Sequence, residues 1–169
     1  YCTPSHKMEQ ARISTCSSFW RCLLLGSVAD VYATSMLTKS DYKAALDCPK
    51  KLWLSSHMHE AKAVPSLAAQ RRMKVGRDVG QLAKGRFPGG VTVPVWELTN
   101  EEAAARTSAL MAAGSPSIFE ATFIHEDCVA RIDVLHREGD RWRIVEVKAT
   151  SKYKKADHLP DVAFQASIF

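Results

Sequence analysis

The chain has 169 residues, with 23 Lys or Arg against 18 Asp or Glu, so its formal net charge is +5. A hydrophobic share of 46% with 24% charged residues can form the packed core of one domain, which excludes a disordered tail or a collagen-like chain. No apolar run approaches the roughly 18 residues that a membrane-spanning helix requires, so we expect no membrane partner.

The two ends of the chain lack the pattern of the middle. Residues 1–35 begin with tyrosine and show no sustained hydrophobic period, so we expect a non-native or disordered leader, with the native start at Met36. Residues 162–169 are typical of a helix broken off in mid-turn, which predicts a domain over residues 36–169 that is truncated at its C-terminus. Only two of five cysteines then remain, which favours a reducing, cytoplasmic setting.

Helix-capping signals divide the first part of this domain. Thr38 followed by Asp41 is a variant of the capping box and predicts a helix through the residues that follow. Pro49 is tolerated in the first turn of a helix, so a second helix is predicted to begin there. A third helix is predicted over residues 65–84, and the Pro-Gly-Gly of residues 88–90 ends it.

Strand patterns dominate the second part. Residues 91–95 alternate like a short edge strand, and an alanine-rich helix is predicted from Thr99 to Gly114. Three further strand-like runs, joined by two-residue turns, occupy residues 118–125, 128–137 and 141–150. This order predicts the α/β class, with a mixed sheet flanked by helices.

Acidic residues of these three strands are predicted to form a row. Counting from the turn at residues 139–140 places Asp133 opposite Glu146, and counting from the turn at residues 126–127 places Glu120 opposite Asp133. Like charges directly opposed destabilise a sheet, so the row requires a compensating cation. The alternative is an exposed sheet face that carries ordinary surface charges.

Carboxylate ligands suit Mg²⁺ or Mn²⁺, which can activate a water and neutralise charge on a phosphate. Lys148 lies two residues beyond Glu146, on the same face of the predicted strand. Its ammonium could orient the nucleophile or stabilise the phosphoryl oxygens. The pattern therefore predicts hydrolysis of a phosphodiester.

Asp133 followed by Glu146-Val147-Lys148 on adjacent strands resembles the PD-(D/E)XK nuclease superfamily. The resemblance is strongest to its RecB-like branch, which includes CRISPR-associated exonucleases and bacterial nucleases of unassigned role. It implies a restriction-endonuclease-like core over residues 36–169. It also implies a metal site whose ligands are Glu120, Asp133, Glu146 and the backbone carbonyl of Val147. The implied catalytic residues are Asp133, Glu146, Lys148 and Gln165.

The sequence departs from the pattern of this branch at three places. Gly80 stands where many members have a histidine that binds metal, and Phe169 stands where a tyrosine follows the motif glutamine. Cys48 matches one of four ligands of a [4Fe–4S] cluster in iron–sulfur members, and the other three are absent from this chain. The cluster is thus expected only in a full-length protein with a further C-terminal domain, and the alternative is a small buried side chain at a helix junction.

Four residues after the motif form a basic segment that contains one aromatic side chain: Lys152, Tyr153, Lys154 and Lys155. Beside a phosphodiester site they are predicted to contact the nucleic-acid backbone without reading sequence, and the tyrosine could stack on a base. The alternative is a plain solvated loop.

Together these features predict a metal-dependent deoxyribonuclease that acts on single-stranded DNA or duplex ends. An exonuclease or a flap-type nuclease of repair, recombination or phage defence fits best. The alternative from another class is a nucleic-acid-binding module that keeps the nuclease fold with little or no turnover. A chain that fails to fold, having lost its final strand, is the third possibility.

Overall fold

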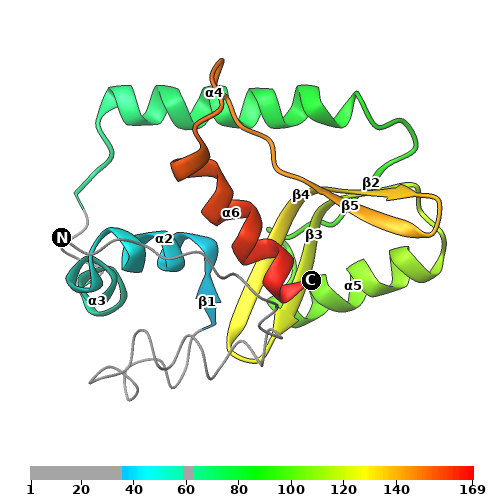
Figure 1. Cartoon of the computed structure of the whole chain (residues 1–169), viewed down its shortest axis with the longest axis horizontal. Helices are drawn as coiled ribbons and strands as arrows, with labels where there is room; N and C mark the ends of the chain where they lie inside the picture. Colours follow the sequence, from blue (N-terminus) through cyan, green and yellow to red (C-terminus); the bar gives the residue numbers. More distant parts are fainter. Residues whose placement is uncertain (1–35, 59–62) are drawn as a thin grey trace, which may run out of the picture.

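The computed structural model describes residues 36–58 and 63–169 of the chain (Figure 1). The leader predicted over residues 1–35 lies outside the described residues. The class is α/β, as predicted, with a mixed five-stranded sheet and helices around it. None of the helices in the described ranges is long and apolar enough to cross a membrane.

The first elements follow the predicted capping signals. They are β1 (Leu37–Thr38), α2 (Lys39–Asp47), α3 (Pro49–His57) and α4 (Leu67–Lys84). Thr38 caps α2 through a complete capping box. The Thr38 hydroxyl accepts from the N–H of Asp41, and the Asp41 carboxylate accepts from the N–H of Thr38. Pro49 occupies the first turn of α3, where its missing N–H costs nothing.

Helix α4 forms as predicted, with Ser66 as its N-cap, but it buries none of its residues. Among its apolar side chains, Leu67 is 73% exposed and Leu82 is 75% exposed. Figure 1 shows α4 along the top of the view, apart from the sheet. The hydrophobic pattern therefore indicated a helix without indicating where that helix packs.

The remaining elements are β2 (Val91–Thr92), α5 (Asn100–Ala112), β3 (Ser117–His125), β4 (Cys128–Glu138), β5 (Arg141–Val145) and α6 (Lys155–Ile168). Both predicted turns are present, since β3 and β4 are joined through residues 126–127 and β4 and β5 through residues 139–140. Both predicted registers are confirmed: Phe119 pairs with Val134, and Val134 pairs with Val145.

Three boundaries differ from the sequence-based predictions. Strand β2 pairs in parallel with β3. It is limited to two residues, because Pro94 lacks the N–H that a longer ladder needs. Strand β5 ends at Val145, so residues 146–150 lie outside the strand that was predicted to contain them. Helix α6 begins at Lys155, seven residues before the stretch 162–169 that was predicted to be helical, and it has Pro160 in its interior.

One edge of β4 is shared by two short strands. Strand β1, which the sequence did not predict, pairs in parallel with residues 128–129, and β5 pairs in antiparallel with residues 134–138. These two strands therefore run toward each other along the same edge, because β3 occupies the opposite one. Residues 130–133 form a gap between their C-terminal ends, which we call the β4 gap.

Two clusters of buried hydrophobic residues stabilise this arrangement. Helix α5 packs against β3, in a cluster centred on Ile118, Ile132 and Leu135. Helix α6 packs against β4 through Phe164 and Ile168, and it also contacts α2. Burial of these side chains places α6 beside the β4 gap.

Gly90 tests the packing of β3. A Cβ atom at this position would lie 2.4 Å from Cζ of Phe119, a ring that is 4% exposed. We expect Gly90→Ala to lower the free energy of unfolding in urea by about 1 to 3 kcal/mol. The matched control is Gly76→Ala in α4, where nothing lies within 4 Å, and it should raise stability by up to about 1 kcal/mol. Equal effects at the two glycines would contradict this packing.

Candidate active site

The acidic pair predicted by the strand register lies at the β4 gap. Asp133 is the last residue of the gap, and Glu146 is the first residue after β5. Directly after Glu146, the N–H of Val147 donates to Oδ2 of Asp133 at 2.7 Å. The N–H of Val147 is thus bonded to a side-chain carboxylate and not to a backbone carbonyl of β4, so the chain leaves the sheet at this point. The same contact holds Glu146 beside Asp133.

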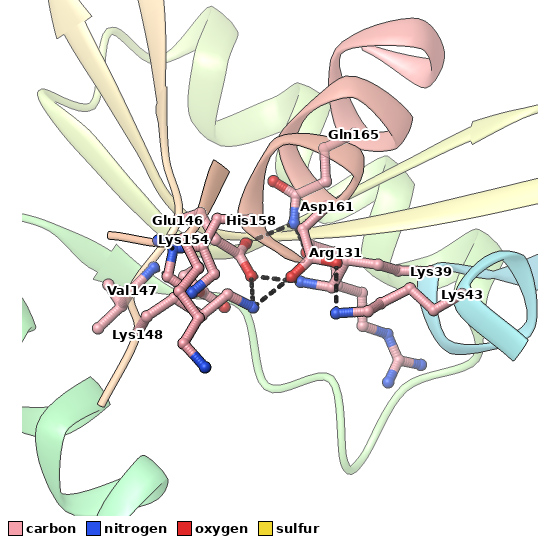
Figure 2. A network of polar contacts seen from close by, with 11 residues as sticks. Lys39, Lys43, Arg131, Glu146, Val147, Lys148, Lys154, His158, Asp161 and Gln165 are labelled. Carbon is pink, nitrogen blue, oxygen red and sulfur yellow. Dashed lines mark hydrogen bonds and ion pairs between the residues drawn. The ribbon is translucent and has the colours of Figure 1, made fainter. Parts of the chain in front are cut away.

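Glu146 is the most heavily paired of these acids. Its Oε1 accepts from the ammonium groups of Lys39 at 2.7 Å and Lys148 at 2.6 Å, and its Oε2 accepts from the amide of Gln165 at 2.6 Å. The side chain is only 5% exposed. Figure 2 shows these groups converging on the carboxylate from α2, from the segment after β5 and from α6.

Asp161 adds a second buried carboxylate to the site. It receives the ammonium of Lys148 at 2.5 Å on one oxygen and that of Lys43 at 3.0 Å on the other, and its side chain is 1% exposed. Lys148 therefore bridges Asp161 and Glu146. The result is a continuous series of alternating charges that runs from Lys43 to Lys39, and we call it the ion-pair chain (Figure 2).

Helix α6 presents two of these groups from one face. Asp161 and Gln165 are separated by one helical turn, so their side chains lie one above the other. Both residues are fully buried. The Gln165 amide also donates to the backbone carbonyl of Arg131 at 3.3 Å, which ties α6 to the β4 gap. Its Oε1 is buried and has no hydrogen-bond partner in the described structure.

The charges act differently on the two acids of the pair. Burial raises the pKa of Asp133 to about 6, and the negative charges of Glu146 and Glu120 act in the same direction. Burial also opposes ionisation of Glu146, but Lys39 and Lys148 outweigh it and hold the pKa of that carboxyl below its usual range. Of the two acids, Asp133 is therefore the one whose charged form the site favours less.

Lys148 is held in its charged form. Burial acts to lower the pKa of its ammonium, but the hydrogen bonds to Asp161 and Glu146 outweigh burial and raise it. The same contact works in reverse on Asp161, whose pKa is lowered by Lys148 and Lys43 in spite of its burial. Lys148 and Asp161 are therefore both charged at neutral pH.

Glu120 lies opposite Asp133 by register, between the pairs Phe119 with Val134 and Ala121 with Ile132. Its backbone φ is +57°, in the left-handed region that residues with a side chain rarely adopt. Among the described residues, no three His, Cys, Asp or Glu side chains are gathered as a ready metal-ligand group. Glu120 is nonetheless close enough for its charge to act on Asp133.

The other residues singled out by the sequence are exposed. Cys48 is a free thiol between α2 and α3, at the junction that was expected, but it is not buried. Lys152, Tyr153 and Lys154 lie in the exposed segment before α6, and Lys155 is the first residue of that helix. The rings of Tyr153 and His158 pack edge to face, with 5.5 Å between their centroids.

Sequence reasoning missed three residues of the ion-pair chain: Lys39, Lys43 and Asp161. Two signals could have found them. Asp161 precedes Gln165 by four residues, which places both on one face of a helix. Lys39 and Lys43 have the same spacing on α2, directly after the Thr38 cap. Neither spacing indicates a partner more than a hundred residues away.

Comparison of the chain with protein-family models, with curated proteins and with solved structures finds no match in any of the three.

The raised pKa of Asp133 has a consequence for stability. A carboxyl that ionises near pH 6 when folded and near pH 4 when unfolded weakens folding above pH 6, and the penalty disappears as the pH falls below about 4. We therefore expect Asp133→Asn to raise the free energy of unfolding at pH 8, in EDTA, by about 1 to 3 kcal/mol. At pH 4 the gain should be close to zero.

Urea unfolding at the two pH values measures this difference. The matched control is Asp140→Asn in the exposed turn after β4, which should stay within about 0.5 kcal/mol of the parent at both. A gain from Asp133→Asn that is the same at pH 8 and pH 4 would show that ionisation is not its cause.

Proposed function

We propose that this chain is a metal-dependent nuclease that hydrolyses DNA phosphodiester bonds on a restriction-endonuclease-like core of the RecB-like branch. The observation that carries the proposal is the meeting of Asp133, Glu146, Lys148 and Gln165 at the β4 gap. Two acids, a lysine and a glutamine converge there from β4, from the segment after β5 and from α6. A surface strand with incidental charges would not bury them.

The donor set fits a hard divalent cation such as Mg²⁺ or Mn²⁺. Asp133 and Glu146 supply carboxylate oxygens, the type of ligand that these ions prefer. The raised pKa of Asp133 marks a carboxyl whose ionisation is opposed by burial and by the neighbouring acids, which a bound cation would relieve. The orphaned Oε1 of Gln165 marks a buried acceptor without a donor. We propose Asp133 and Glu146 as the principal ligands, with Glu120 and the backbone carbonyl of Val147 as the others.

Such a cation, when bound, would lower the pKa of a water and neutralise charge on the phosphate. The residues of the chain would do the rest. Lys148 is positively charged and held between Asp161 and Glu146, so it can orient a water through its ammonium protons and stabilise developing charge on the phosphoryl oxygens. It is not a proton acceptor in this state. Gln165 fixes the Glu146 carboxylate.

The backbone at Glu120 also supports a functional site at this place. A non-glycine residue at φ +57° costs of order 1 kcal/mol or more and persists only where the surroundings impose it. Such residues concentrate at active sites. Glu120 lies directly across from Asp133, on the adjacent strand of the same site.

DNA is the proposed substrate, bound by its backbone through the exposed basic segment of residues 152–155. We propose single strands or duplex ends as the form of this substrate, with an exonuclease or flap-type activity. An iron–sulfur cluster that uses Cys48 remains a proposal for a longer protein, and the exposed position of this thiol is compatible with it.

A binding module without turnover is the second candidate, and two positions favour it. Phe169 occupies the place of a tyrosine and therefore lacks its hydroxyl. Its ring packs edge-on against that of Phe123, with 4.9 Å between the ring centroids. Gly80 occupies the place of a histidine, in the α4 helix that buries no residue. Both changes would weaken catalysis more than binding.

The test of the proposed function is degradation of end-labelled single- and double-stranded DNA with Mn²⁺. We expect the parent chain to cleave and Lys148→Ala and Asp133→Asn each to lose at least about 100-fold in rate. Asp133→Asn is informative because it should be more stable than the parent, so its loss of activity cannot result from unfolding. Lys51→Ala, an exposed lysine on α3, should cleave like the parent.

Two results would contradict the proposal in different ways. A folded parent that binds DNA without cleaving it would favour the binding module. Cleavage that survives in both Lys148→Ala and Asp133→Asn would place the activity outside this site. Circular dichroism of each variant establishes that it is folded.

The basic segment generates a separate prediction about DNA binding. Lysines that contact phosphates release counterions, so affinity falls with salt concentration. We expect the double variant Lys152→Ala and Lys154→Ala, measured in EDTA, to bind DNA more weakly and to lower the slope of log affinity against log salt by about 1 to 2. An unchanged slope would assign these lysines to a plain solvated loop.

A further inference from the structure

Lys39 occupies the carboxylate that the proposed metal site needs. Its ammonium lies 2.7 Å from Oε1 of Glu146, the same oxygen that Lys148 contacts at 2.6 Å. The other oxygen accepts from Gln165. Oε1 of Glu146 therefore already holds two ammonium groups, and a cation that binds this oxygen must displace one of them (Figure 2).

The three groups around Glu146 are not equally easy to displace. Lys148 has a second carboxylate partner, Asp161, at 2.5 Å, and Gln165 is fully buried and also bound to the β4 backbone. Lys39 has Glu146 as its one ion-pair partner among the described residues, and 26% of its side chain is exposed. Loss of its contact leaves an ammonium that water can solvate, so Lys39 is the group that exchanges at least cost.

The position of Lys39 makes this exchange local. It is the first residue of α2 and directly follows β1, whose C-terminal end points into the β4 gap. The helix itself is held by the Thr38 cap and by packing against α6. Rotation of one long side chain out of the gap would free Oε1 without moving the backbone.

We propose that Lys39 is a built-in counter-cation of the site, which a divalent metal ion replaces at Glu146 when it binds. This inference rests on the proposed metal-dependent function. It assigns to Lys39 the role of setting metal affinity, because the metal-competent form is the fraction of molecules in which Lys39 has left Glu146. The displaced ammonium keeps its charge beside the site.

The test is binding of Mn²⁺ alone, measured by the electron paramagnetic resonance signal of the free ion, with no DNA present. We expect Lys39→Gln to bind Mn²⁺ about tenfold more tightly than the parent, because the competing ammonium is gone. Lys39→Arg, which keeps the charge and can still reach Glu146, should bind like the parent or more weakly.

The matched control is Lys43→Gln, one turn along α2. It removes the same charge close by, but the contact it deletes is to Asp161 and not to Glu146. If direct occupation of Glu146 is the cause, this variant should tighten Mn²⁺ binding by no more than about twofold. Equal tightening in the two glutamine variants would show a general field effect and would overturn the proposal.

The remaining outcomes separate this inference from the proposed function. A parent that binds Mn²⁺, with no tightening in Lys39→Gln, overturns the role of Lys39 and leaves the nuclease proposal standing. Tightening in Lys39→Gln together with a parent that cleaves no DNA upholds Lys39 and overturns the nuclease. Absence of Mn²⁺ binding in every variant overturns both.

Discussion

The β4 gap is the constraint on which the candidate site depends. Two short strands share one edge of β4 and run toward each other, so their C-terminal ends deliver Lys39 and Glu146 to the same unpaired stretch. Continuous pairing along this edge would place Glu146 inside a ladder. Glu146 lies outside any ladder because β5 stops at Val145 and the N–H of Val147 bonds to Asp133.

The site also shows how a small domain can bury acidic groups. Glu146 and Asp161 are almost completely removed from solvent, and each oxygen of these carboxylates has a charged or amide partner. Burial of an unpaired carboxylate would cost several kcal/mol, so the lysines are required wherever no other cation is present. Asp133 is the exception, with a single backbone donor and a raised pKa.

Local rules predicted the parts of the structure that local interactions determine. The Thr38 capping box, the start of α3 at Pro49 and the register around both turns follow from residues a few positions apart. What could not be predicted depends on distant partners. The end of β5 follows from a side chain on another strand, and the exposure of α4 follows from the lack of any element that covers it in the described structure. The sequence did not predict Lys39 and Asp161 as site residues for the same reason, because their ion-pair partners are distant in the chain or on another element.

The separation of Lys39 and Glu146 by 107 residues has a consequence for the order of folding. Strands β3, β4 and β5 form a meander joined by two-residue turns, so their contacts close short loops at a small entropic cost. The ion-pair chain instead joins the first described helix to the last. Because contacts of long sequence separation form against the largest loss of chain entropy, we expect the meander to form first and the charged site to assemble late.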